Sequence, residues 1–148
     1  MTGVMSAELI ATAARHLNPH RVDDRLFGDV AASILTDSGA VFSGVCIDTS
    51  CGTGFCAEHA AIAAMVTAGE YRILKIVAVW RGQSGELFVL PPCGRCREFI
   101  RQIDPRNLDA EIILGEDTSS PLRDLLPRNE WPQPLPTAPR PPSDNGSR

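Results

Sequence analysis

Apolar residues recur at helical spacing at the start of the chain and at strand-like spacing further along it. Residues 5–17 have the apolar spacing of a helix, with Ser6 as a candidate N-cap and an Asn-Pro pair at its end. Two apolar segments, 29–36 and 40–47, flank the turn sequence DSG. This pattern predicts one helix followed by a β-hairpin.

The pattern then alternates between strands and helices. Residues 73–80 (ILKIVAVW) form an apolar, β-branched run typical of a buried strand, and a second strand is expected at 87–90 after a glycine-containing turn. The other expected elements are helices from Cys56, at 94–102 and at 121–126, and a strand at 110–114. This order predicts an α/β protein: a three-layer α/β/α sandwich with a central mixed five-stranded sheet, in which crossover helices make the later strands parallel.

Composition separates a folded body from a tail. The chain has 148 residues, and the part from residue 127 onward holds seven of the twelve prolines. Its only large apolar residues are Trp131 and Leu135. Such a segment cannot bury enough apolar surface to fold alone. We therefore expect one domain over residues 1–131 and a proline-rich, disordered tail over 132–148.

Charge and hydropathy argue against several kinds of partner. The net charge of −4 gives no attraction to phosphate backbones, so nucleic acid is not an expected partner. No apolar run approaches the roughly 18 residues that a membrane span needs, and residues 1–18 lack the pattern of a signal peptide. We expect a cytoplasmic protein without a membrane partner.

Three of the five cysteines stand at the starts of expected helices. Cys56 begins one helix, and Cys93 and Cys96 form a CxxC pair at the start of another. A helix N-terminus favours the thiolate form of cysteine, which is the form that binds metal. A CxxC pair with a third, distant cysteine predicts a Zn²⁺ site, one per subunit, with an open fourth position. By itself, CxxC is also found in structural zinc knuckles and redox pairs.

A glutamate accompanies the first of these cysteines. Glu58 follows Cys56 by two residues, so at the helix start it can face the same metal without being a ligand. A carboxylate in that place can take a proton from a bound water and pass it on. The spacing therefore predicts catalytic zinc with Glu58 as the catalytic acid and base.

These two motifs resemble a known superfamily. The sequences CAEH, beginning at Cys56, and PCGRCR, beginning at Pro92, are similar to the signature of the zinc-dependent cytidine deaminases. A cysteine as first ligand resembles the branch of small homotetrameric cytidine deaminases and blasticidin-S deaminases. The resemblance implies hydrolysis of a cytidine-type pyrimidine nucleoside, or of an analogue such as blasticidin S, to the uridine-type product and ammonia.

The resemblance also implies residues that bind the substrate. Phe27 matches a phenylalanine that packs beside the nucleoside, while Cys46 and Asp48 stand where the family has the asparagine and glutamate that hold ribose and base. Cysteine is a poor hydrogen-bonding partner and aspartate is one methylene shorter than glutamate, so an unusual pyrimidine nucleoside is an open alternative. Trp131 resembles the family's C-terminal aromatic, which in the tetrameric branch reaches the site of another subunit; the alternative is a frayed aromatic on a loose tail.

Charge around the zinc raises a further expectation. Three thiolates outweigh one Zn²⁺ by one negative charge, and His59 stands where the cytidine deaminases usually have arginine. Arg95, Arg97 or a protonated His59 is expected to offset this charge. The alternatives are a helix-face histidine packed against a neighbour and, for Arg95, a surface salt bridge or a contact with the substrate.

Three alternatives stay open from the residues alone. Cys51 is either a fourth ligand that makes the zinc structural or, like Cys46, a small buried residue. The small residues of 60–65 serve either the core or a close contact between the subunits of the expected homotetramer. The altered residues 46 and 48 also allow a zinc-containing protein that binds a nucleoside without turning it over.

Overall fold

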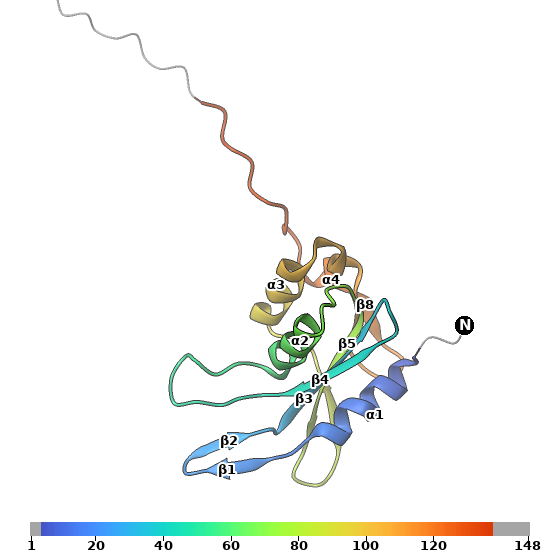
Figure 1. Cartoon of the computed structure of the whole chain (residues 1–148), viewed down its shortest axis with the longest axis vertical. Coiled ribbons are helices and arrows are strands. Elements are labelled where there is room, and N and C mark those ends of the chain that lie inside the picture. Colours follow the sequence, from blue (N-terminus) through green and yellow to red (C-terminus); the bar gives the residue numbers. More distant parts are fainter. Residues whose placement is uncertain (1–3, 138–148) are drawn as a thin grey trace, which may run out of the picture.

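A six-stranded mixed sheet forms the middle layer of the computed structural model, which describes residues 4–137 (Figure 1). Along the sheet the strands run in the order β4 (Val41–Val45), β3 (Val30–Thr36), β5 (Ile73–Arg81), β7 (Glu111–Ile113) and β8 (Ser119–Pro121), and β6 (Leu87–Leu90) pairs with the last part of β5. The β5–β7 pair is parallel and the other pairs are antiparallel.

Helices cover both faces of this sheet (Figure 1). On one face, α1 (Ser6–His16) packs on β3 and β5. On the opposite face, α2 (Ala57–Thr67) packs on β4 and β3, beside α3 (Gly94–Ile103). The smaller elements are the hairpin of β1 (His20–Val22) and β2 (Arg25–Phe27), the 3-10 helix η1 (Pro105–Asp109) and α4 (Leu122–Leu125).

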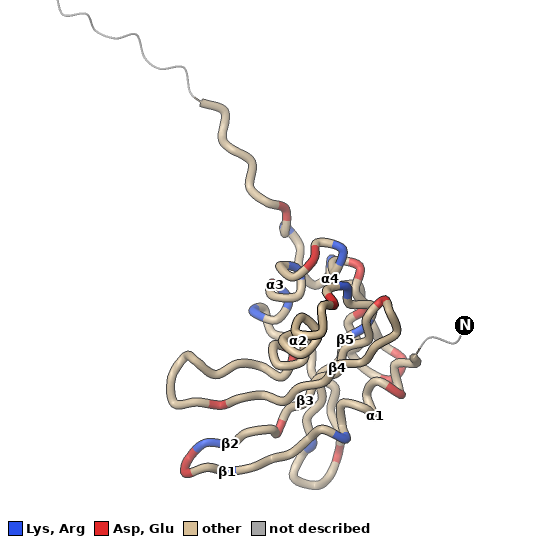
Figure 2. Tube along the Cα trace, viewed as in Figure 1, with Lys and Arg blue, Asp and Glu red and all other residues tan. Residues whose placement is uncertain are grey.

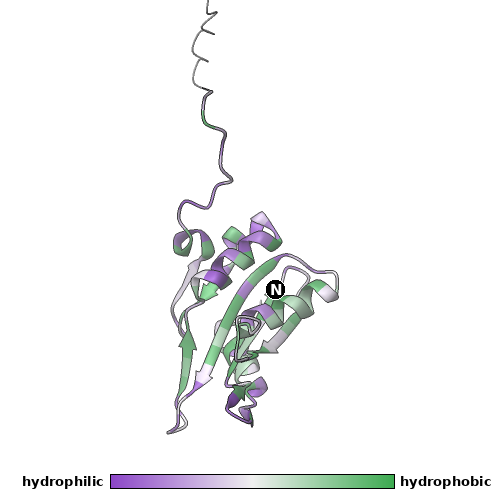
Figure 3. Cartoon of the chain, turned by 90° about the vertical axis from the view of Figure 1, so that its left-hand side faces the viewer, coloured by the Kyte–Doolittle hydropathy of each residue, from purple (hydrophilic) through white to green (hydrophobic). Residues whose placement is uncertain are grey.

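The central strands are apolar on both faces, which explains the three layers. In β5, Ile76 and Ala78 belong to the core beneath α2 and α3, whereas Val77 and Val79 belong to the core beneath α1. Successive side chains of a strand point to opposite faces, so a strand with helices on both sides is apolar throughout. Figure 3 shows this concentration of hydrophobic residues in the strands of the sheet.

Helix α2 lies unusually close to the sheet. A Cβ atom at Gly44 would stand 2.5 Å from the Cβ of Ala60 and from the backbone nitrogen of Ala61. Ala61, Ile62 and Met65 are buried in the core of the same chain. Part of the stretch 60–65 thus serves packing within the chain, whereas Ala63 is exposed, so a contact between subunits stays open.

The predicted fold class is confirmed, with differences in detail. The hairpin of β3 and β4, the strands β5, β6 and β7 and the helices α1, α3 and α4 are found within two residues of their predicted ends, and α2 begins one residue after Cys56. The sheet has six strands rather than five, because β8 has the sequence SSP, which carries no strand pattern. The hairpin of β1 and β2 was not predicted for a similar reason: its residues are exposed or half-buried and do not alternate.

Two local predictions are wrong. Ser6 is the first residue of α1 rather than its cap; Met5 is the N-cap, and its backbone N–H donates to Glu8 Oε2 over 2.9 Å. Of the later strands only β7 is parallel to its neighbour β5, because β6 returns from β5 through a tight turn and is antiparallel to it.

The chain beyond α4 carries no helix or strand over residues 131–137, which run away from the body of the molecule (Figure 1). Residues 138–148 lie outside the described part, so disorder of the predicted tail 132–148 stays a prediction. No helix within residues 4–137 has both the length and the apolar character needed to cross a membrane.

Charged residues of both signs lie near one another around α3 and α4 (Figure 2). Three arginines of this region form ion pairs with nearby carboxylates: Arg101 with Glu98, Arg106 with Asp104, and Arg123 with Asp109. These pairs place opposite charges side by side in this part of the chain.

Candidate active site

Two helices begin side by side, and each has a cysteine as its N-cap. Cys56 caps α2 and Cys93 caps α3, and their Sγ atoms are 3.7 Å apart. The Sγ atoms of Cys93 and Cys96 are 3.4 Å apart. In a tetrahedral zinc site with Zn–S bonds of about 2.3 Å, neighbouring sulfurs are about 3.8 Å apart. The three thiols therefore fit one zinc ion.

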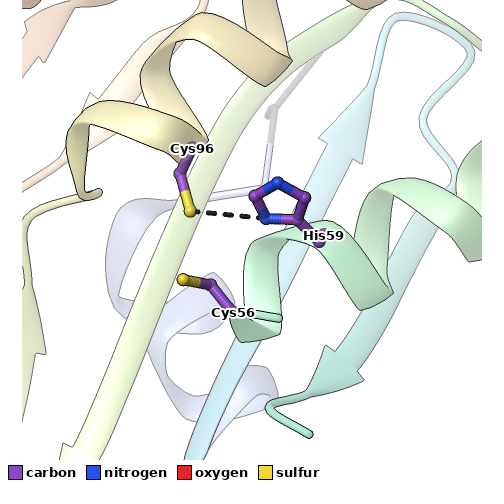
Figure 4. A group of neighbouring side chains, drawn as sticks. All are labelled: Cys56, His59 and Cys96. Carbon is purple, nitrogen blue, oxygen red and sulfur yellow. Dashed lines mark hydrogen bonds between the residues drawn. The ribbon is translucent and has the colours of Figure 1, made fainter. Parts of the chain in front are cut away.

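His59 stands one helical turn after Cys56 and approaches the same sulfurs (Figure 4). Its Nδ1 lies 3.5 Å from the Sγ of Cys96, and the ligand atoms of Cys56, His59 and Cys96 all lie within 4.8 Å of one another. The ring also stacks on Phe99, with centroids 4.3 Å apart and planes 7° apart. His59 is thus both packed against a neighbour and close enough to touch a metal ligand.

The charges of these groups favour a cation between the sulfurs. Burial raises the pKa of Cys56, and burial together with the charge of Glu58 raises the pKa of Cys96. Burial raises the pKa of Cys93, but hydrogen bonds with the backbone and side chain of Cys96 outweigh this effect, so its pKa is lowered overall. Three thiolates in such a place are costly without a positive ion, and a bound metal ion removes that cost.

The carboxyl group of Glu58 is buried beside these thiols. Glu58 is only 5% exposed, and burial raises the pKa of its carboxyl group. It lines a cavity of about 200 Å³ together with Cys56 and Cys93. The remaining walls of this cavity are mainly apolar and include Val30, Ala78 and Leu90. We call this space the apolar cavity.

A second, more polar space adjoins the apolar cavity. This polar recess has a volume of about 420 Å³ and shares Cys46 and Cys56 with the cavity. Its polar lining includes Asp29, Asp48, Thr49, Cys51 and Arg95. The two spaces form one cleft, in which Glu58 and Cys93 line only the apolar part and Cys56 lines both parts.

Residues 6–110 match the family model described as the cytidine and deoxycytidylate deaminase zinc-binding region. The chain belongs to this family. A blasticidin-S deaminase from Bacillus cereus is 33% identical over 103 residues, which span 66% of this chain and 74% of that enzyme. A cytidine deaminase from Mycobacterium tuberculosis is 38% identical over 72 residues, which span 48% of this chain and about half (51%) of that enzyme.

Solved structures agree with this assignment. The crystal structure of cytidine deaminase from Mycobacterium tuberculosis is 29% identical, with a TM-score of 0.66 over 82% of this chain and 94% of that chain. The cytidine deaminase from Burkholderia pseudomallei is 25% identical, with a TM-score of 0.68 over 86% of this chain and 98% of that chain. The chain is therefore a zinc-dependent deaminase of the hydrolase class, and the predicted zinc cofactor is confirmed.

The structure brings some of the predicted substrate-binding residues of this deaminase together. Cys46 and Asp48 line the polar recess. Phe27 is half-buried at the end of β2, and its neighbour Leu26 lines the recess instead. Trp131 is 73% exposed and lines neither space. The roles predicted for Phe27 and Trp131 stay predictions.

His59, Arg95 and Arg97, the groups expected to offset the thiolate charge, have three different surroundings. Burial, and then the nearby charge of Arg95, lower the pKa of His59, which was one of the three groups expected to offset the charge. Arg95 lines the polar recess and donates to the carbonyl of Gly54 over 3.4 Å. Arg97 donates to the carbonyls of Pro92 and Leu125, over 2.8 and 3.1 Å, so its guanidinium joins the start of α3 to the end of α4.

Cys51 is exposed rather than buried, and its Sγ lies 3.1 Å from Thr53 Oγ1 in the loop beside the recess. Among the described residues, the group that can hold a metal is Cys56, His59 and Cys96, which includes neither Cys51 nor Cys93. Cys93 joins the site through its Sγ distances of 3.7 Å to Cys56 and 3.4 Å to Cys96, and Cys51 has no such contact among the described residues. Sequence reasoning also missed Asp29, which lines the recess. The only signal for Asp29 was a charged residue at the start of an otherwise apolar strand.

We expect Cys93→Ala to lose zinc and to lower the free energy of unfolding, because it removes one of three thiolates and metal binding is coupled to folding. His59→Ala should keep one zinc per chain, since we assign His59 no coordination bond. Cys51→Ala is the matched control and should keep both zinc and stability. Elemental analysis after dialysis, with denaturant unfolding, measures both quantities.

The opposite result would change the ligand set. If Cys93→Ala keeps one zinc per chain while His59→Ala loses it, then Cys56, His59 and Cys96 hold the metal instead.

Proposed function

We propose that this deaminase converts a cytidine-type pyrimidine nucleoside, or a cytosine nucleoside analogue such as blasticidin S, to the uridine-type product and ammonia. The observation that carries the proposal is the buried carboxyl group of Glu58, which shares the apolar cavity with Cys56 and Cys93. A buried carboxyl group is costly to the folded state, so its presence beside a metal site is best explained by chemistry.

The shape and polarity of the cleft support a nucleoside. The apolar walls of the cavity suit a flat pyrimidine ring, and its polar groups are gathered at the thiol end. A ring that enters with its exocyclic amine toward Glu58 leaves its sugar at the junction with the polar recess. That junction is marked by Cys46 and Cys56, which line both spaces.

In the proposed reaction Glu58 moves protons between three places. Cys56, Cys93 and Cys96 would hold the zinc ion, which when bound would act as a Lewis acid and lower the pKa of a water molecule toward neutrality. Glu58 takes a proton from that water as its oxygen attacks carbon 4 of the ring, and gives a proton to ring nitrogen 3. The same carboxylate then takes the remaining proton of the attacking oxygen, now a hydroxyl group on carbon 4, and delivers it to the departing amine, which leaves as ammonia while carbon 4 becomes a carbonyl.

The charges of the polar recess favour a nucleoside over a nucleotide. Two carboxylates, Asp29 and Asp48, and one guanidinium, Arg95, line it. A phosphate ester would meet more negative than positive charge there, whereas sugar hydroxyl groups can donate hydrogen bonds to carboxylates.

A second candidate function is a zinc-containing protein of the same fold that binds a nucleoside without turnover. The unusual residues Cys46 and Asp48 in the recess motivate it. It accounts for the cleft but gives no purpose to the buried Glu58, so we favour the enzyme.

Ammonia release from a panel of compounds tests the choice. The panel contains cytidine, deoxycytidine, 5-substituted cytidines, cytidine monophosphate, cytosine and blasticidin S. We expect turnover of at least one nucleoside or nucleoside analogue and little of cytosine or the monophosphate. Binding of a nucleoside without ammonia release would support the second candidate.

We expect Glu58→Gln to lower kcat by about 100- to 10,000-fold, because the amide keeps the shape of the side chain but cannot carry the proton. Zinc content should stay at one per chain. Glu116→Gln, which changes an exposed glutamate between β7 and β8, is the matched control and should keep full activity. Activity of Glu58→Gln close to that of the wild type would place the proton carrier elsewhere.

We also propose that the protein is a cytoplasmic homotetramer with Trp131 of one subunit reaching the site of another. Five free cysteines fit a reducing compartment. The exposure of Trp131 supports an intermolecular role, because a large aromatic side chain in water leaves apolar surface unburied. In the stretch 60–65, Ala63 is exposed, so this helix stays available for a contact between subunits.

Trp131→Ala should raise KM roughly fivefold, as expected for the loss of an aromatic contact worth about 1 kcal/mol. Leu135→Ala is the matched control, since Leu135 is exposed in the same segment and has no assigned role. Steady-state kinetics gives KM, and sedimentation velocity gives the assembly. A monomer, or an unchanged KM in Trp131→Ala, would contradict a site shared between subunits.

A further inference from the structure

Asp29 stands at the junction between the apolar cavity and the polar recess. It is half-buried, lines the recess, and its Oδ1 accepts a hydrogen bond from the Sγ–H of Cys46 over 3.1 Å. Cys46 in turn lines both the cavity and the recess. Asp29 is therefore in direct contact with a residue that lines both spaces.

The backbone holds Asp29 in a fixed place. The carbonyl of Cys46 accepts from the N–H of Gly28 over 3.2 Å, and the N–H of Cys46 donates to the carbonyl of Val30 over 3.0 Å. Asp29 is therefore bracketed by two hydrogen bonds to a single residue. Gly28 has a φ of +72°, and a Cβ there would stand 2.4 Å from the carbonyl oxygen of Asn18, so the bend before β3 needs glycine.

The carboxylate of Asp29 has unused capacity to accept hydrogen bonds. An ionised carboxylate offers about four acceptor sites, and Cys46 takes one of them. Within residues 4–137, no lysine, arginine or histidine forms a salt bridge with Asp29. Asp48, the other carboxylate of the recess, is exposed and therefore better hydrated.

Cys46 is the donor in its contact with Asp29. Burial, followed by the hydrogen bond to Asp29, raises the pKa of the Cys46 thiol, so the proton stays on sulfur. A thiol used in this way is a weak partner for a sugar hydroxyl, whereas the adjacent carboxylate is a strong acceptor.

We propose that Asp29 determines specificity for the sugar, by accepting hydrogen bonds from the hydroxyl groups of the nucleoside. The proposal rests on the proposed function, because it assumes a nucleoside whose base occupies the apolar cavity. The two oxygens of one carboxylate match the two hydroxyls of a ribose diol. A site built to pair hydroxyl groups discriminates strongly against an analogue that lacks them, because its polar group is then left unpaired.

The test compares cytidine with 2′,3′-dideoxycytidine, which has the same base but lacks both ribose hydroxyls of the diol. We expect Asp29→Ala to lower kcat/KM for cytidine by about 10- to 100-fold, mainly through KM, as is usual for the loss of a hydrogen bond to a charged group. The value for dideoxycytidine should change by less than about threefold, since it never made that bond. Asp24→Ala, which removes an exposed carboxylate from the turn before β2, is the matched control.

Two further variants separate binding from support of the fold. Asp29→Asn has nearly the same shape but no charge, and it should also lose the preference for cytidine over dideoxycytidine. It therefore serves as the test should Asp29→Ala fail to fold. Cys46→Ala removes the hydrogen bond to Asp29 but keeps the carboxylate, and it should keep the preference. Equal losses for both substrates in the Asp29 variants, or the same loss of preference in Cys46→Ala, would overturn the proposal and make Asp29 a support for Cys46.

Measuring equilibrium binding tests the role of Asp29 in sugar recognition without requiring turnover. In the Glu58→Gln background, calorimetric Kd values for the two nucleosides should show the same dependence on Asp29. Absence of ammonia release by the wild type would refute the deaminase activity, while the ratio of Kd values would still decide the role of Asp29. If neither nucleoside binds, or if the ratio does not depend on Asp29, the inference is wrong.

Discussion

Three sulfur atoms converge between the first turns of α2 and α3, and as thiolates they would repel one another without a cation among them. Their spacing of 3.4 to 3.7 Å is close to the edge of a zinc tetrahedron. The rest of the fold serves to hold these two helix starts together. Gly44 lets α2 lie directly on β4, and Arg97 fastens the start of α3 to the carbonyls of Pro92 and Leu125.

The same arrangement divides the cleft by polarity. Glu58 and Cys93 line an apolar cavity, and a polar recess adjoins this cavity at Cys46 and Cys56, which line both spaces. The proposed nucleoside fits this division, because a flat, weakly polar ring suits the cavity and the hydroxyl groups of a sugar suit the acceptors of the recess. In the proposed pose the exocyclic amine of the base faces the carboxyl group of Glu58.

The sequence alone was enough for the features that depend on local chain geometry. Cys56 and Cys93 are helix caps, and Glu58 lies one turn or less from the first of them, so their convergence follows from short motifs and the order of elements. Features that depend on pairing between distant segments were not predicted. Asp29 reaches Cys46 only through the register of β3 against β4 and the bend at Gly28, and Arg97 binds a carbonyl 28 residues away. The short strands of β1, β2 and β8 have no alternating pattern because little of their surface is buried.

X-ray absorption at the zinc edge of the purified protein tests most directly whether the metal has an open position beside Glu58. We expect three sulfur ligands at about 2.3 Å and one light atom at about 2.0 Å, without the outer scattering of a coordinated imidazole. Four sulfurs with no light atom would indicate a closed, structural site. Two sulfurs with an imidazole signal would place His59 in the coordination shell, and either result would contradict a catalytic zinc held by Cys56, Cys93 and Cys96.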